Sequence, residues 1–308
     1  MRLVYLVLLA FSITVVHAQK ISSARWSDLF SYNNVLQIRE DDGQLIAATE
    51  NGIFYYNISS GEIKKLSKAN GLHEVKISAF DYNPTTKVGL VGYQNGTLDV
   101  ITEDNVTYVV DIPIATGYSG DRKINHISIN GNRAVISVGY GVSVFNLERK
   151  EFEDTAFFME NGRFIGAVES IIKGDQVYAI TNSGIKSHII DVTFPVFSSW
   201  NTVINGSFKH ISTDGTLIAY SDNTKVSYGN GQNFLTLSAS FGTIKDIVVA
   251  KNTMIISENN KASIYNNSGV LVKTHSFPES LNSAWSTNNL IYGASTTNGI
   301  LNENSVSI

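Results

Sequence analysis

Aromatic and basic side chains gather in three segments that are predicted to connect regular elements. Tyr118, Arg122 and Lys123 lie in the longest segment, Arg163 lies in the next one, and Trp200 lies in the one after that. An arginine guanidinium binds phosphate or carboxylate through parallel hydrogen bonds, and aromatic rings pack against the apolar faces of sugars. If the segments converge in space, these side chains form a rim suited to an anionic glycan. The alternative is structural: the rings pack in the core and the charges are solvated.

The other residues form no recognisable catalytic motif. No two histidines have the i, i+4 spacing of a helical zinc site, and there is neither a Gly-x-Ser-x-Gly elbow nor a phosphate-binding loop. Without cysteine there is no thiolate metal site, and Glu40-Asp41-Asp42-Gly43 fits a solvated turn better than a calcium loop. We therefore predict no catalytic residues, no metal and no cofactor. The alternative, a secreted lyase or hydrolase, requires Tyr, His, Arg or carboxylate side chains that cluster on one face after folding.

The composition favours a folded protein that does not bind nucleic acid. The formal charge is −4, charged residues make up 16% of the chain, and apolar residues make up 43%. Nucleic-acid binding requires a basic surface that neutralises phosphates, and disorder requires a low apolar content. The sequence argues against both classes.

The N-terminus has the pattern of a signal peptide. Arg2 supplies the positive charge, Leu3–Val16 is an uncharged and mostly apolar run, and Val16-His17-Ala18 approximates a cleavage site. We predict a signal peptide over residues 1–18; the alternative is an uncleaved anchor, for which the apolar run is short. No later segment is apolar enough to span a membrane. An exported chain without cysteine suits a Gram-negative envelope, so we expect it in the periplasm or at the outer-membrane surface.

One pattern recurs along the rest of the chain: a short apolar strand, a polar turn, a second apolar strand, a second turn and a third strand. Its first copy runs from Val35 through the turn at Asp42-Gly43 to Tyr56. Seven copies, this one included, occur at intervals of about 41 residues, which is the blade length of WD-type propellers. The fifth and sixth copies are the weakest, because they lack the glycine of the second turn.

These copies predict an all-β fold over residues 19–308, namely a single seven-bladed β-propeller with four antiparallel strands in each blade. The blades are expected to begin near positions 33, 75, 124, 167, 209, 244 and 283. The seventh copy leaves little chain for a fourth strand. We therefore predict that residues 23–32 pair into the last blade and close the ring, which removes an exposed sheet edge. An unrepeated β-sandwich is the alternative, but it does not explain the constant period.

Three segments resemble known propellers. Asp42-Gly43-x-Leu45-x-Ala47-Ala48-Thr49-x-x-Gly52-Ile53 and Ser67-Lys68-x-Asn70-Gly71-Leu72 resemble the regulator-propeller repeat of sensor proteins in Bacteroidetes. The opening segment Trp26–Val35 is more specifically similar to the start of the N-terminal propeller of PorZ-type accessory proteins of the type IX secretion system. The resemblance extends over essentially the whole mature chain and is sharpest near its start.

This resemblance implies a non-enzymatic binding and assembly module of the cell envelope. PorZ-type proteins combine two propellers with a C-terminal sorting domain, at the outer face of the outer membrane. The implied partners are an anionic lipopolysaccharide or another envelope glycan, which is delivered to the sortase complex, and the sortase or other secretion-complex proteins. Because the chain ends at Ile308 after one propeller, we expect a fragment or a shortened relative. The alternative is the periplasmic ligand-sensing propeller of a hybrid two-component regulator.

Overall fold

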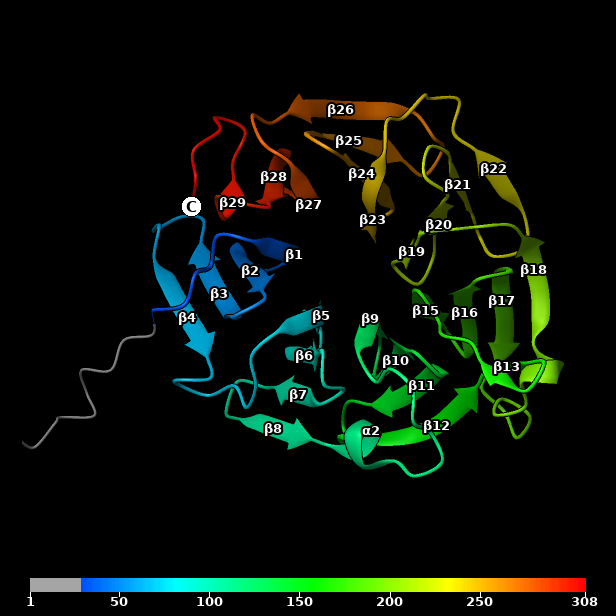
Figure 1. The fold of residues 1–308 in the computed structure, drawn as a ribbon. Helices are drawn as coiled ribbons and strands as arrows, with labels where there is room; N and C mark the ends of the chain where they lie inside the picture. The colour runs from blue at the N-terminus through cyan, green and yellow to red at the C-terminus, as the bar shows by residue number, and fades with distance from the viewer. Residues whose placement is uncertain (1–28) are drawn as a thin grey trace, which may run out of the picture.

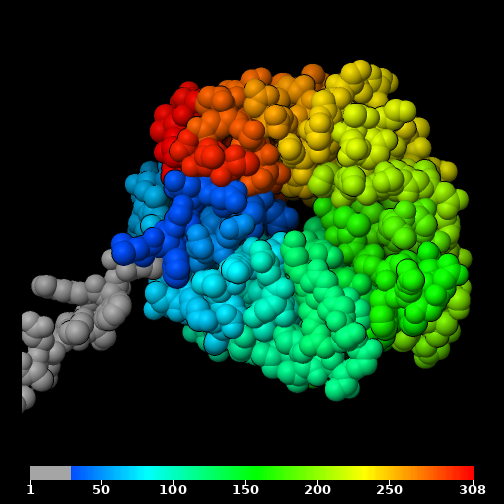
Figure 2. All heavy atoms as spheres, viewed as in Figure 1, coloured from blue at the N-terminus to red at the C-terminus, as the bar shows by residue number. Residues whose placement is uncertain are grey.

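The computed structural model describes residues 29–308, which form a ring of seven antiparallel sheets around a central channel (Figure 1). Six of these sheets have four strands, joined in chain order, and the last has three. The predicted all-β, seven-bladed propeller is therefore confirmed. Figure 2 shows the ring hollowed at its centre, where the blades meet. The predicted signal peptide over residues 1–18 lies outside the described residues.

Each blade is a meander whose first strand lines the channel and whose last strand lies at the rim (Figure 1). The first two blades consist of β1 (Val35–Asp41), β2 (Gln44–Thr49), β3 (Gly52–Asn57) and β4 (Ile63–Ser67), then β5 (Ile77–Asn83), β6 (Val88–Tyr93), β7 (Leu98–Ile101) and β8 (Val106–Val109). The next two consist of β9 (Ile124–Asn130), β10 (Arg133–Val138), β11 (Gly141–Asn146) and β12 (Glu151–Phe157), then β15 (Ser170–Lys173), β16 (Gln176–Thr181), β17 (Gly184–Ile189) and β18 (Asn201–Asn205).

The remaining three blades complete the ring. They consist of β19 (His210–Thr213), β20 (Ile218–Ser221), β21 (Val226–Gly229) and β22 (Phe234–Thr236), then β23 (Ile244–Ala250), β24 (Thr253–Glu258), β25 (Lys261–Asn266) and β26 (Leu271–Ser276), then β27 (Leu281–Thr287), β28 (Leu290–Ser295) and β29 (Ile300–Leu301). Outside the blades lie a small hairpin and two helical turns: β13 (Met159–Glu160), β14 (Arg163–Phe164), α2 (Asp111–Ile114) and a 3-10 turn (Phe197–Ser199). No helix in residues 29–308 has the length and apolar character needed to cross a membrane.

The second strand of each blade is buried on both faces. In β2, Leu45 and Ala47 pack in a cluster with the last blade, whereas Ile46 and Ala48 pack in a cluster with the second blade. Neighbouring blades thus cover both sides of the strand. This is why the second strands are continuous apolar runs rather than alternating ones. The core of the molecule is a set of layers between blades.

The first turn of each blade lies at one end of the channel and requires left-handed backbone. Asp42 and Gly43 have φ angles of 49° and 76°, and Asn288 and Asn289 have φ angles of 51° and 61°. Gly, Asn and Asp adopt this conformation at low cost, and it matches the twist of a two-residue hairpin. The turns therefore place short polar side chains around this end of the channel.

The ring closes where the start of the described chain meets the last blade. The backbone N–H of Gly299 donates to the carbonyl of Asn33 over 2.7 Å. The edge of β29 that faces away from β28 is bonded by the last residue, because the N–H of Ile308 donates to the carbonyl of Ile300 over 2.8 Å. Residues 23–28 of the predicted closing strand lie outside the described residues, and residues 29–32 contain no strand. Closure by a full N-terminal strand stays a prediction.

Candidate functional site

Polar side chains of the first strands line the channel, and most of them bind the backbone of the next blade. Gln37, Asp81, Glu169 and Ser212 accept hydrogen bonds from the backbone N–H groups of Phe80 (3.2 Å), Ile129 (2.7 Å), Ile211 (2.8 Å) and Val249 (2.9 Å). The amide of Asn282 donates to the carbonyl of Val35 over 2.7 Å and so joins the last blade to the first. A first strand has one edge without a neighbouring strand, and these side chains satisfy its free backbone groups. These contacts are structural.

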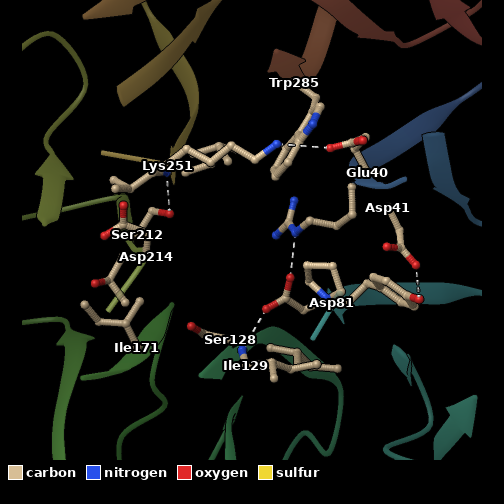
Figure 3. A pocket seen from close by; sticks show the side chains of 18 of the residues that line it. Glu40, Asp41, Asp81, Ser128, Ile129, Ile171, Ser212, Asp214, Lys251 and Trp285 are labelled. Carbon is tan, nitrogen blue, oxygen red and sulfur yellow. Dashed lines mark hydrogen bonds and ion pairs between the residues drawn. The ribbon is translucent and has the colours of Figure 1, made fainter. Parts of the chain in front are cut away.

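The channel widens into a cavity of about 530 Å³ at the end formed by the first turns, which we call the turn end. Figure 3 shows Asp81, Ser128, Ser212 and Trp285 around this space, each from a different blade. Ile171, from a further blade, adds an apolar wall. The cavity has the size of a site for a small molecule.

Arg39 is held firmly at the wall of this cavity. Its Nε donates to Asp81 Oδ1 over 2.6 Å, and its Nη1 donates to the carbonyl of Ile38 over 2.9 Å. The guanidinium carbon lies 5.7 Å from the ring centroid of Trp285, within the range of a cation–π contact. The side chains of Arg39 and Asp81 are only 14% and 11% exposed, so the pair is largely desolvated.

The charges around the turn end are largely paired. Lys87 Nζ lies 2.5 Å from Asp41 Oδ1, and Lys251 Nζ lies 3.3 Å from Glu40 Oε2. Asp41 also accepts a hydrogen bond from the hydroxyl of Tyr82 over 2.8 Å. Burial, together with this bond to a carboxylate, raises the pKa of Tyr82, so the phenol stays protonated. The three cationic side chains of the cavity lining are thus all paired, and its five carboxylates outnumber them.

A second group of ionisable side chains lies toward the opposite end of the channel. His210 Nδ1 is 2.9 Å from Glu169 Oε1, and Ser283 Oγ donates to Asp246 over 2.5 Å. Burial is the largest single influence and disfavours both charges of the first pair. The hydrogen bond and attraction between the partners, with the N–H of Ile211 on Glu169, are among the effects that together outweigh it, so the pKa of His210 is raised and that of Glu169 is lowered. Burial raises the pKa of Asp246. The channel interior thus contains an ion pair next to a carboxyl group that resists ionisation.

The opposite end of the channel, which we call the connection end, is formed by the segments that lead from one blade to the next. A recess of about 620 Å³ there is lined by Lys123, Lys209, Asn125 and Asn182, together with the His210–Glu169 pair. Both lysines are exposed, and neither takes part in an ion pair within residues 29–308. This end therefore presents two lysines that have no carboxylate partner within that part of the chain.

Two of the aromatic residues that the sequence suggested for binding are buried. Tyr118 packs edge-on against Tyr140 and Phe164, with ring centroids 5.2 and 4.9 Å apart. Trp200 is 6% exposed, and its Nε1 donates to the carbonyl of Phe194 over 2.9 Å. In this packing neither ring offers a free face to a sugar, so both have a structural role here.

The three basic residues of the predicted rim divide into two kinds. The guanidinium of Arg122 donates to the backbone carbonyls of Pro113, Ala115 and Tyr118, and it therefore closes the end of α2 and the loop after it. Lys123 and Arg163 are exposed. Of the five predicted binding residues, only these two present their side chains to solvent, and Lys123 lines the connection-end recess.

The nearest approach to a catalytic arrangement ties a connection to its blade. His73 Nδ1 lies 2.7 Å from Asp99 Oδ1, while Asp99 Oδ2 accepts bonds from the backbone of His73 (2.9 Å) and the hydroxyl of Tyr93 (2.5 Å). Within residues 29–308 no serine or threonine hydroxyl is hydrogen-bonded to His73. The same part of the chain contains no group of three His, Asp or Glu side chains arranged for a metal ion.

Sequence reasoning missed Arg39, Asp81 and Lys209. The first two are charged residues at the fifth position of the first strands of adjacent blades. That repeated position was the available signal. Aligning the first strands, rather than the connections, would have predicted that these side chains share the channel.

Residues 45–201, a little more than half of the 308 residues, match the family of PorZ N-terminal β-propeller domains of the type IX secretion system. The chain belongs to this family. The predicted PorZ-type family is thereby confirmed. No curated protein sequence matches the chain.

Solved structures support the fold of this PorZ-type propeller. PorZ of Porphyromonas gingivalis, an essential bacterial surface component of the type IX secretion system, superimposes with a TM-score of 0.73 at 18% identity, over 90% of this chain. The chain spans 37% of the length of that protein. The WD40 propeller domain of Doa1 superimposes with a TM-score of 0.63 at 10% identity, over 87% of this chain and 91% of that one. At these identities the likeness concerns the fold alone.

Proposed function

We propose that this PorZ-type propeller is a non-enzymatic binding and assembly module of a type IX secretion system. It acts in the periplasm or at the outer-membrane surface, binds an anionic lipopolysaccharide, and works with the sortase or other proteins of the secretion complex. Membership of the PorZ family, established over residues 45–201, is the observation that carries this proposal.

The charge of the connection end supports an anionic ligand. The seven blades repeat one topology, so their first strands all start at this end of the channel. Lys76, Lys123, Lys209 and Lys245 stand at or next to these starts, and all four are exposed. Within residues 29–308 none of them is in an ion pair. Lysines grouped around one opening produce a positive potential that attracts phosphate and carboxylate groups.

Calorimetry with purified anionic lipopolysaccharide tests the proposal. The double variant Lys123→Ala/Lys209→Ala should weaken binding about tenfold or more, since each charge-assisted contact contributes on the order of 1 kcal/mol or more. Added salt should weaken binding of the unmodified chain, because exposed charges are screened within about 8–10 Å.

The matched control is Lys64→Ala/Lys225→Ala, which removes the same charge away from the channel. It should bind nearly as well as the unmodified chain. A lipopolysaccharide affinity that is indifferent to salt and equal in both double variants would contradict the anionic-ligand part of the proposal. Failure to retain either lipopolysaccharide or sortase-complex proteins would contradict the whole.

A further inference from the structure

The turn-end cavity contains hydrogen-bonding groups that the fold itself does not use. Ser212, which lines this cavity, is occupied by the backbone N–H of Val249 in the next blade. Arg39 Nη2 and Ser128 Oγ, in contrast, form no hydrogen bond within residues 29–308. Figure 3 shows the Ser128 side chain at the cavity wall, close to Asp81. A donor and a hydroxyl are thus left open to the same space.

The groups around this opening are rigidly held. Asp81 is bonded at both carboxylate oxygens, to Arg39 Nε over 2.6 Å and to the N–H of Ile129 over 2.7 Å. Arg39 is further fixed by the carbonyl of Ile38 and by the ring of Trp285. Side chains locked in this way lose little conformational entropy when a ligand binds.

The charge pairing at the turn end selects the class of ligand. Arg39, Lys87 and Lys251 each have a carboxylate partner within 3.3 Å. An anion would meet these carboxylates, and a cation would have to compete with the lysines and the arginine. A neutral ligand with several hydroxyl groups avoids both costs, because each hydroxyl can donate to a carboxylate and accept from a guanidinium.

We propose that the turn-end cavity binds a neutral saccharide of one or two sugar units. Two adjacent hydroxyls of a sugar ring bond to Arg39 Nη2 and the Asp81 carboxylate, and a third bonds to Ser128. The apolar face of the ring packs against Val248, which lines the same cavity. The cavity volume of about 530 Å³ accommodates a ligand of this size.

This site is separate from the connection end, so its test does not depend on the proposed function. The probes are glucose, galactose, mannose, N-acetylglucosamine, lactose and maltose, with glucosamine and glucuronate as charged comparisons. Ligand-observed NMR and calorimetry are used on the purified chain. At least one neutral sugar should bind with a Kd of about 1 mM or tighter, and the affinity should not change with salt.

Two variants locate the binding. Ser128→Ala should weaken it about fivefold, the loss of one neutral hydrogen bond, and Arg39→Gln should weaken it at least about tenfold. Ser286→Ala, on the first strand of the last blade and outside the cavity lining, is the matched control and should leave the affinity unchanged. Lys123→Ala/Lys209→Ala should also leave it unchanged.

The proposal is overturned if no neutral probe binds at about 10 mM, a concentration that detects even weak sites. It is also overturned if only a charged probe binds, or if Ser128→Ala binds as tightly as the unmodified chain. If Arg39→Gln does not fold, the result for Ser128→Ala decides whether the proposal stands, because the Ser128 side chain makes no hydrogen bond within residues 29–308 that holds the blades together.

Discussion

The two ends of the channel are built from the same seven first strands but use charge in opposite ways. At the turn end, Arg39, Lys87 and Lys251 are each paired with a carboxylate. At the connection end, Lys123 and Lys209 are exposed and belong to no ion pair of residues 29–308. Paired charges cancel over short distances, whereas unpaired ones project a field over about 8–10 Å. One end is therefore suited to short-range hydrogen bonding, and the other to the attraction of a charged ligand.

Removal of the Asp81 carboxylate should have the largest effect on stability, because it disrupts the charge pairing of the turn end. Asp81→Ala leaves the largely buried guanidinium of Arg39 without its carboxylate and the N–H of Ile129 without its acceptor. We expect the free energy of unfolding to fall by about 3 kcal/mol, as for other buried pairs that lose one partner. Denaturant unfolding measures the change. Asp42→Asn, at a side chain that is 97% exposed and in a left-handed turn that asparagine also tolerates, is the control and should stay within about 0.5 kcal/mol.

A smaller loss of stability is expected at the connection end. Arg122→Ala removes hydrogen bonds from a guanidinium to the backbone carbonyls of Pro113, Ala115 and Tyr118. The free energy of unfolding should fall by about 2 kcal/mol, since hydrogen bonds to charged groups contribute about 1.5–3 kcal/mol.

Lipopolysaccharide affinity tells whether Arg122 has a structural role or binds the ligand. It should change less in Arg122→Ala than in Lys123→Ala, because the guanidinium of Arg122 is already occupied by the backbone. If Arg122→Ala instead lost lipopolysaccharide affinity while keeping its stability, the sequence-based prediction that Arg122 binds the ligand would be supported.

The ion pair inside the channel should make stability depend on pH. The folded-state pKa of His210 is raised by Glu169, so the protonated imidazole stabilises the fold below the unfolded-state pKa of about 6.5. This contribution is lost as the pH rises through the raised pKa. The free energy of unfolding should therefore decline from about pH 6 upward, and His210→Gln should flatten the decline.

The control for this pH dependence is His275→Gln, on the outer strand β26 and away from Glu169. It should keep the decline seen in the unmodified chain. A His210→Gln variant with an unchanged pH profile would show that the ion pair does not couple to folding.

The smallest effect should come from the exposed lysines. Lys123→Ala/Lys209→Ala should change the free energy of unfolding by no more than about 0.5 kcal/mol, because neither side chain holds a structural contact. The same double variant should lose lipopolysaccharide affinity. A large loss of stability would mean that the connection end is structural, as the turn end is, and the comparison would fail.

The number and kind of blades could be predicted because a local pattern encodes them. Both faces of a second strand such as β2 are buried between blades, so its apolar residues are continuous in the sequence. Even the fifth blade, which lacks the glycine of the second turn, is complete. There the carboxylate of Asp222 accepts bonds from the N–H groups of Thr224 and Lys225, each over 2.7 Å, and so shapes the turn by side-chain contacts.

The binding residues were harder to predict because the connections between blades have no period. Tyr118 and Trp200 looked available for a ligand, but packing buries both rings, and the backbone occupies Arg122. Nothing in the local sequence separates these residues from Lys123, which stays exposed. The difference arises from how each loop folds back on its neighbours.

The sequence by itself determined the repeat, the all-β class and the family, because strand propensity, turn residues and burial on both faces act within one blade. Only the tertiary structure decided which side chains share the channel. Arg39, Asp81 and Ser128 lie on three different blades, and each is the fifth residue of its own first strand. They meet because the first strands of successive blades pack side by side around one axis, which turns the same position in each repeat into neighbouring points on one wall.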